Sequence, residues 1–318
     1  MRISYLPNEY SQQRQREKKR KIYPVLMAMQ AEYYRRQGHH VIWDSPINDA
    51  DKYVYKPEDI PFSCLPPPDR EFTQWWKYQD NGNFKYHPAT YIMSAIGCLW
   101  GGCTFCVENN VQYQIRILDS VIDEIRKCKD MGFREVFDDS ATFHYLGYWF
   151  KNFCKQMKEI DIKFSCNMRM VDADYSMMKE AGFRMLLFGL ESANQRTLDK
   201  IGKGTKVEDI KYIIKASKAG LEPHIAVMFG YPWETDKEAK NTLELTHYLL
   251  RKGYAKTAQA SFYSPNGIQG DNIQHRKYVN KIYGVWKYPE FWYNKITDIK
   301  CKEDIVYLWT CIKAGLFS

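Results

Sequence analysis

Apolar and polar positions change their period repeatedly along this chain, from a pattern typical of strands to one typical of amphipathic helices. Six strands are predicted at 91–96, 134–137, 162–168, 185–190, 223–229 and 256–262, and five helices between them at 118–131, 145–160, 174–181, 207–219 and 236–252. Strands that alternate with helices favour a parallel sheet. The pattern therefore predicts an α/β fold, a partial (β/α)6 TIM-like barrel.

The segments outside this repeat predict three further regions. Residues 1–65 contain a strand at 2–6, a helix at 23–37 and a strand at 40–43, which together leave room for half of a doubly wound domain. We interpret this region as a truncated Rossmann-like remnant. Residues 66–89 form a linker rich in proline and aromatic residues, 90–265 the barrel, and 266–318 an aromatic-rich capping segment with a helix at 304–316.

Composition narrows the class of protein. The chain has 318 residues, of which 45% are hydrophobic, so it can bury a full core. It contains no apolar run long enough to cross a bilayer and no apolar core of a secretory signal, so no membrane contact is expected. Nine cysteines without a secretory signal indicate a reducing compartment, and we expect a cytoplasmic protein without disulfides.

The charge balance leaves the substrate class open. The net charge is +8, from 46 Lys and Arg against 38 Asp and Glu, and a basic run covers 14–21. Basic clusters bind phosphates, but such a run is also typical of a solvated surface. Nucleic acid therefore stays one candidate substrate, while a small molecule or a peptide is favoured.

Three cysteines follow the first predicted strand within nine residues: Cys98, Cys103 and Cys106. The loop contains Gly101 and Gly102, whose conformational freedom is expected to let the thiolates converge on one point. Thiolates bind zinc or iron–sulfur clusters. Because three ligands are one short of four, two sites are consistent with the loop: a zinc site with a distant fourth ligand, or a [4Fe–4S] cluster with one open iron.

Polar residues or glycine follow the later strands as well. In barrels of this type the chemistry lies on the loops that follow the strands, so these residues are expected to surround the cysteines. They are Asp139, Ser140 and His144 after the second strand, Arg169 after the third, Glu191 after the fourth, and Gly230 and Tyr231 after the fifth.

The combination resembles the radical SAM superfamily, specifically the branch whose members often carry an N-terminal cobalamin-binding domain. The resemblance covers about residues 86–265 and rests on the cysteine loop and on four further segments, 138–140, 189–192, 198–203 and 230–235. The chain departs from the family pattern at one point. It has C-x4-C-x2-C where the family has C-x3-C-x2-C.

The resemblance implies a [4Fe–4S] cluster on Cys98, Cys103 and Cys106, and S-adenosylmethionine (SAM) bound to its open iron. Reductive cleavage of SAM would then give a 5′-deoxyadenosyl radical that abstracts a hydrogen atom from a substrate. Asp139 and His144 are the implied catalytic residues. The implied cofactor-binding residues are Phe105, Asp139, Ser140, Arg169, Glu191, Lys200, Gly230 and Tyr231.

Two alternatives accompany this interpretation. The first is a cobalamin-dependent radical SAM methyltransferase, although residues 1–65 contain no Asp-x-His-x-x-Gly stretch for ligation of cobalt. The second is a non-catalytic binding protein stabilised by zinc or by a cluster. The enzymatic interpretations also imply an electron donor such as flavodoxin or ferredoxin.

Overall fold

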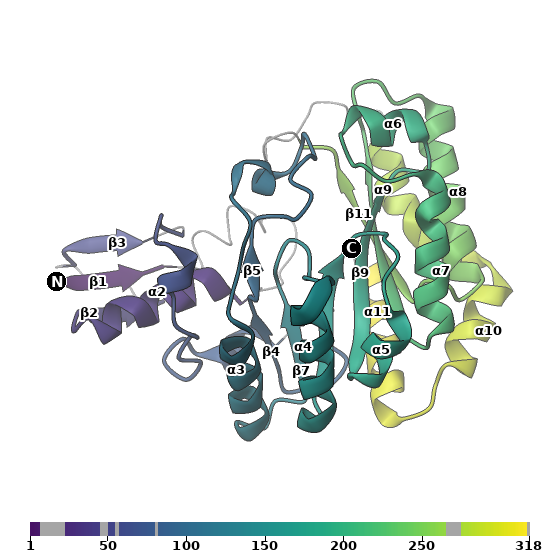
Figure 1. Cartoon of the computed structure of the whole chain (residues 1–318). Coiled ribbons are helices and arrows are strands. Elements are labelled where there is room, and N and C mark those ends of the chain that lie inside the picture. The colour runs from purple at the N-terminus through teal and green to yellow at the C-terminus, as the bar shows by residue number, and fades with distance from the viewer. Residues whose placement is uncertain (7–22, 45–49, 55–56, 80–81, 265–274, 317–318) are drawn as a thin grey trace.

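The computed structural model of this chain describes residues 1–6, 23–44, 50–54, 57–79, 82–264 and 275–316. A six-stranded sheet with the order β11-β10-β9-β8-β7-β4 forms its centre, and every neighbouring pair in it is parallel. The sheet curves into a half-barrel (Figure 1), which confirms the predicted fold class. Its strands are β4 (Ala89–Ile92), β7 (Glu135–Asp138), β8 (Lys163–Met168), β9 (Phe183–Glu191), β10 (Glu222–Phe229) and β11 (Thr257–Phe262).

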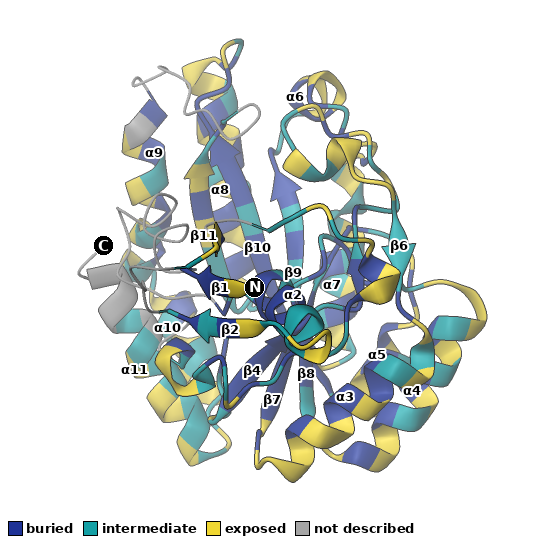
Figure 2. Ribbon diagram, turned by 90° about the vertical axis from the view of Figure 1, so that its left-hand side faces the viewer, coloured by how far each residue is buried: buried dark blue, intermediate teal, exposed yellow. Residues whose placement is uncertain are grey.

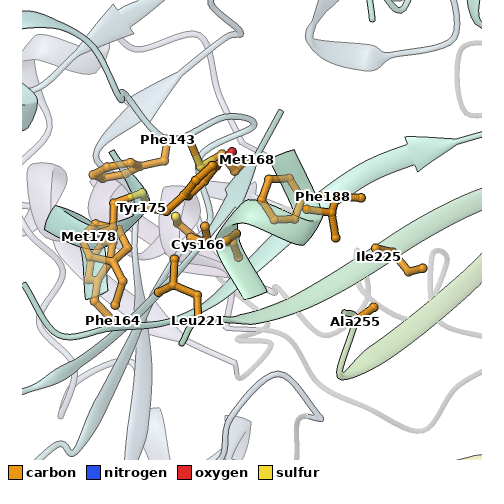
Figure 3. Close-up of a cluster of buried hydrophobic side chains, with 14 of the residues drawn as sticks. Phe143, Phe164, Cys166, Met168, Tyr175, Met178, Phe188, Leu221, Ile225 and Ala255 are labelled. Carbon is orange, nitrogen blue, oxygen red and sulfur yellow. The ribbon is translucent and has the colours of Figure 1, made fainter. Parts of the chain in front are cut away.

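Helices cover the convex face of this sheet because each has one apolar face. On α3, for example, Val121, Ile122 and Ile125 are buried, as predicted. Figure 3 shows part of the resulting core, where Phe164, Cys166 and Met168 of β8 lie among other buried side chains. The helices of this layer are α3 (Leu118–Asp130), α4 (Gly147–Ile160), α5 (Tyr175–Glu180), α7 (Ile210–Lys218) and α8 (Asp236–Arg251).

The N-terminal region forms a second, smaller parallel sheet with the order β2-β1-β3. It lies in front of the concave face of the half-barrel (Figure 2). One hydrophobic cluster joins Tyr5 and Met27 of this region to Tyr91, Phe137 and Met185 of the barrel. Its elements are β1 (Arg2–Tyr5), α2 (Val25–Arg36), β2 (His40–Trp43) and β3 (Lys52–Val54). The basic run at 14–21 lies outside the described residues.

The first predicted strand is divided in two. β4 ends at Ile92, and β5 (Ala95–Ile96) pairs instead with β6 (Gln114–Ile115) as an antiparallel hairpin. The division occurs because the Ser94 and Ala95 amides donate to the Ser140 hydroxyl, at 3.1 and 2.9 Å. The cysteine loop therefore lies on a hairpin that leaves the barrel.

The remaining helices lie at the carboxyl end of the barrel strands and in the C-terminal region of the chain. α6 (Gln195–Lys200) lies between β9 and α7, and α9 (Arg276–Lys281), α10 (Pro289–Thr297) and α11 (Lys302–Leu316) follow the barrel. Within the described ranges, none of the helices combines the length and hydropathy required to span a bilayer. The 3₁₀ turns are Phe62–Cys64, Trp75–Tyr78, Val107–Asn110, Val207–Asp209 and Ile282–Lys287.

A buried histidine near the amino end of β10 gives the fold a predictable dependence on pH. His224 Nδ1 lies 2.7 Å from Thr257 Oγ1. Burial lowers the pKa of His224 to about 4, against a smaller opposing effect of a hydrogen bond with Gln259. Because the pKa in the unfolded chain is about 6.5, the stability that the neutral ring contributes is complete above that pH. It is lost as the pH falls from about 6.5 towards 4.

We therefore expect acid to destabilise the wild-type apoprotein more than the His224→Gln variant. Between pH 7 and pH 4.5, the wild-type protein should lose about 2.4 kcal/mol more free energy of unfolding than the variant, as measured by urea unfolding. Buried carboxylates contribute equally in both proteins, so the comparison isolates the imidazole. The same pH dependence in both proteins would show that His224 does not titrate in this range.

Candidate active site

The cysteine loop turns back on itself at the carboxyl end of the barrel. Gly97 begins it at φ +69°, where a Cβ atom would lie 2.7 Å from the Val111 carbonyl oxygen, so the hairpin requires glycine. The Cys106 amide then donates to the Cys103 carbonyl oxygen at 3.1 Å. Cys103 is buried, whereas Cys98 and Cys106 are half-buried.

Positive charge faces these thiols. Burial raises the pKa of the Cys103 thiol, and the nearby Lys203 and Arg169 charges oppose this effect. At Cys98 burial also opposes ionisation, but hydrogen bonds from the Gly101 amide and the Thr142 hydroxyl leave the pKa below its usual value. The surroundings thus favour anionic sulfur at Cys98, whereas burial outweighs the opposing effects and raises the pKa at Cys103 and at Cys106.

Among the described residues, no three His, Cys, Asp or Glu side chains form a group that could hold one metal ion. The convergence of the three thiols on one cofactor therefore stays a prediction. A [4Fe–4S] cluster has a less strict requirement, because its cysteines bind different iron atoms of one body. The half-buried loop, its glycines and the facing cations fit such a cluster.

Arg169 and Glu191 lie where the sequence places them, directly after β8 and at the end of β9. Both are 8% exposed. Arg169 donates to the Lys203 carbonyl oxygen at 2.7 Å, and the Lys203 ammonium lies 2.7 Å from the Glu191 carboxylate. Glu191 adopts φ +61°, a conformation that costs a non-glycine residue about 1–3 kcal/mol and is typical of functional sites.

Two lysines near the end of α6 differ in burial and in contacts. Lys200 is exposed, and its ammonium lies 5.0 Å from the centre of the Trp233 ring. Lys203 is buried beside Cys103 and Glu191. The resemblance implies a cofactor-binding role for Lys200 and not for Lys203, because the turn that buries Lys203 depends on contacts distant in sequence. Lys203 is the better placed of the two to contact a cofactor, and the role implied for Lys200 stays a prediction.

Two residues of the loop after β7, Asp139 and Ser140, differ in their contacts. The Ser140 hydroxyl donates to Asp138 at 2.6 Å and accepts from the Ala95 amide, so it holds the β4–β5 turn. Asp139 is half-buried, and its amide donates to the Ile92 carbonyl oxygen at 2.9 Å. Asp139 therefore remains a candidate for direct contact with SAM. Ser140 remains a candidate as well, but its hydroxyl also stabilises the β4–β5 turn.

His144 lies on the same loop and contacts a residue that sequence reasoning missed. Its Nδ1 is 2.9 Å from the Tyr113 hydroxyl, and the two rings are stacked. Burial lowers the pKa of His144, so the neutral ring is favoured near neutral pH. A neutral imidazole that is hydrogen-bonded to a phenol can accept or relay a proton.

The loop after β10 is held by a carboxylate. Gly230, at φ +86°, donates its amide to Glu234 at 2.7 Å, and the same carboxylate oxygen lies 2.8 Å from His275 Nδ1. Tyr231 stacks on Trp233 with ring centres 5.6 Å apart. Glu234 could have been found within the motif at 230–235, but His275 comes from a distant segment without such a signal.

Aromatic rings form one wall of the site. The Phe105 ring lies 6.3 Å from that of Tyr263, which in turn lies 4.8 Å from Tyr231. These residues come from the cysteine loop, the end of β11 and the loop after β10. Their cluster also includes the buried Leu198 and Ile201, and Phe105 is its partly exposed member on the cysteine loop.

A cavity of about 430 Å³ occupies the opposite, amino end of the barrel. It is lined by lysines and carboxylates, among them Lys85 and Glu222, which form an ion pair at 2.7 Å. None of the predicted site residues lines it. The candidate active site therefore remains the cluster of loops at the carboxyl end.

Comparison with known proteins found matches to the barrel. The family model of the radical SAM superfamily matches residues 93–246. A protein of Pyrococcus horikoshii described as an uncharacterized methyltransferase is 27% identical over 196 residues, which make up 58% of this chain and 41% of the relative. The chain thus spans less than half of the length of that relative.

Solved structures share the fold at lower identity. The radical SAM methyltransferase TsrM from Kitasatospora setae, with tryptophan and a SAM analogue bound, has a TM-score of 0.51 and 18% identity, over 67% of this chain and 41% of TsrM. The cobalamin-dependent radical enzyme OxsB, with aqua-cobalamin bound, has a TM-score of 0.51 and 16% identity, over 91% of this chain and 43% of OxsB. Residues 93–246 of this chain thus match the radical SAM superfamily, and solved structures of radical SAM enzymes share the fold of its barrel.

Proposed function

We propose that this chain is a radical SAM enzyme whose Cys98, Cys103 and Cys106 hold a [4Fe–4S] cluster. When bound, this cluster supplies the electron that cleaves SAM to a 5′-deoxyadenosyl radical. One observation carries the proposal: the cysteine loop is hydrogen-bonded to the same turn, at 201–204, that contacts Arg169 and Glu191. Cluster ligands and candidate SAM-binding residues thus belong to one connected unit.

The buried charges suggest how the chain would orient SAM. The Arg169 and Lys203 charges both act on Cys103, and both side chains are proposed to receive the methionyl carboxylate, which a guanidinium can bind bidentately. Asp139 is proposed to accept from the methionyl amino group, and Glu191 from a ribose hydroxyl.

The apolar side of the site would receive the adenine. Phe105 and Tyr231 belong to the aromatic wall, and Gly230 has no side chain to obstruct the ring. Aromatic surfaces of this kind stack on planar bases and exclude water. The His144–Tyr113 pair, whose phenol lies close enough to Cys98 to interact with it electrostatically, is proposed to handle a proton of the substrate.

A second function is favoured by one observation. The N-terminal sheet has the parallel order β2-β1-β3 of a doubly wound domain, although it is much smaller. Cobalamin-dependent methyl transfer is therefore the alternative to hydrogen abstraction alone. Cobalamin that remains bound to the purified protein, together with a methylated product, would favour it.

The partners follow from the chemistry of the family. Radical SAM enzymes need a reductant and a substrate, and we propose flavodoxin or ferredoxin for the first and a small molecule or peptide for the second. A cytoplasmic location is proposed from the cysteine content, because an oxygen-labile cluster requires a reducing compartment.

The test is an assay for 5′-deoxyadenosine after anaerobic reconstitution with iron and sulfide. We expect about four iron and four sulfide per chain and reductant-dependent formation of 5′-deoxyadenosine. A Cys98→Ala, Cys103→Ala, Cys106→Ala variant should lose both. Purified protein that contains zinc, lacks sulfide and does not cleave SAM would instead support the non-catalytic binding protein.

A further inference from the structure

The cysteine loop of this chain has a feature that the proposed function does not require. Its first interval contains one residue more than the family pattern, and this interval includes Trp100, Gly101 and Gly102. The Trp100 side chain is 46% exposed, so burial in the core does not explain its position. Its contacts show what the longer interval accomplishes.

Trp100 reaches from the cysteine loop to the turn formed by residues 201–204, here called the 201–204 turn. Its indole N–H donates to the Gly202 carbonyl oxygen at 2.8 Å. Beside it, the Thr104 amide donates to the Ile201 carbonyl oxygen at 2.9 Å. The two hydrogen bonds attach the cysteine loop to a segment about one hundred residues further along the chain.

Two glycines let the 201–204 turn approach the cysteine loop: Gly204 leaves room for the indole, and Gly202 leaves room for the backbone of the loop. A Cβ atom at Gly204 would lie 2.0 Å from Trp100 Cζ2, and one at Gly202 would lie 2.3 Å from the Gly102 carbonyl oxygen. Both glycines also adopt positive φ, +64° and +62°. The contact between the cysteine loop and the 201–204 turn therefore depends on the indole of the loop and on the glycines of the turn.

The other neighbour of the indole is a candidate SAM-binding cation. The Arg169 guanidinium lies 4.8 Å from the centre of the Trp100 ring, within the range of a cation–π contact. Arg169 also donates to the carbonyl oxygen of Lys203, in the 201–204 turn, at 2.7 Å. Trp100 therefore contacts both the turn and Arg169.

We propose that Trp100 and the extra residue of the loop form a positioning device that fixes the cysteines relative to Arg169 and Lys203. The longer interval lets the indole reach the 201–204 turn, and the indole in turn orients the guanidinium. The inference rests on the proposed function, since it assigns a positioning role within that site. The Trp100 backbone amide donates to the Cys98 thiol, whereas the positioning role belongs to the indole, which contacts the 201–204 turn and Arg169.

The test compares variants that break the contact from either side. Trp100→Ala removes the indole, and Gly204→Ala displaces it. Gly132→Ala is the backbone control, because Gly132 has φ +89° and a Cβ atom added there would meet no other atom within 4 Å. Trp309→Ala removes a tryptophan that is 57% exposed on α11. Each protein is reconstituted anaerobically and examined for iron, sulfide, SAM affinity and the EPR spectrum of the reduced cluster.

We expect Trp100→Ala and Gly204→Ala to bind SAM about tenfold more weakly, a change of about 1.4 kcal/mol, and to give an altered EPR spectrum with SAM. Trp100→Phe, which keeps a ring for Arg169, should recover part of the affinity. Both control variants should behave as wild type. Thermal melting of all apoproteins verifies that the fold persists.

The experiment distinguishes a failure of the proposed function from a failure of the positioning role. If the wild-type protein shows no effect of SAM on the cluster, the proposed function is wrong. If the wild-type protein responds to SAM and Trp100→Ala matches it in affinity and spectrum, the function stands and the positioning role is overturned.

Discussion

Replacing Arg169 by alanine is expected to weaken SAM binding by roughly 10- to 150-fold, which corresponds to the 1.5–3 kcal/mol typical of a hydrogen bond to a charged group. Arg169 is 8% exposed, and its orientation is fixed by the Lys203 carbonyl oxygen and the Trp100 ring. A preorganised buried cation loses little entropy when it binds a carboxylate. Equilibrium dialysis of the reconstituted protein with labelled SAM measures the effect.

Two companion variants separate the binding role from a general effect of charge. Arg169→Lys keeps the charge but loses the planar fork, so it should recover only part of the affinity. Lys200→Ala removes an exposed lysine whose ammonium lies over Trp233, and it should bind SAM like wild type. Equal losses for Arg169→Ala and Lys200→Ala would contradict the assignment of Arg169.

Replacing Glu124 by alanine is expected to destabilise the protein by about 3–5 kcal/mol. Glu124 is 1% exposed and binds two arginines, Arg70 at 2.6 Å and Arg116 at 2.5 Å. Both arginine side chains are also buried. Removal of the carboxylate leaves two buried cations without their shared partner, which costs far more than the loss of a surface pair.

The Glu124 network also affects the candidate site. Arg116 directly follows β6, the strand that pairs with β5 at the base of the cysteine loop, and Arg70 donates to the Tyr91 carbonyl oxygen of β4. We therefore expect Glu124→Ala to retain less iron after reconstitution. Urea unfolding of the apoprotein measures stability, and Glu180→Ala, which removes an exposed pair with Lys158, should cost less than about 1 kcal/mol. Similar losses for the two variants would refute the central role of this network.

The sequence predicts the barrel well because its signals are local. Each strand of the half-barrel is an apolar run next to a helix with one apolar face, and turn glycines separate many of them. β5 and β6 were missed because their pairing depends on Ser140, which withdraws the chain from the sheet at Ser94. β3 was missed because three residues, Lys52–Val54, give too short a pattern.

The candidate site can be predicted from the sequence only in part, because some of its residues are brought together by contacts distant in sequence. Arg169 and Glu191 follow strands, so their position in the sequence indicates their place at the carboxyl end of the barrel. Lys203 and Trp100 are different, because the 201–204 turn brings them to the cysteines through contacts about one hundred residues apart. The placement of His275 beside Glu234 likewise depends on tertiary structure alone. The domain boundaries and the roles of the individual site residues remain predictions.

The measurement that tests the central claim most directly is the EPR spectrum of the reduced, reconstituted protein with and without saturating SAM. An iron without a cysteine ligand should bind SAM, so the g-values are expected to change on addition of SAM. The variant without Cys98, Cys103 and Cys106 should give no cluster signal. A cluster spectrum that is identical with and without SAM would contradict the proposed function, because it would mean that SAM does not reach the iron.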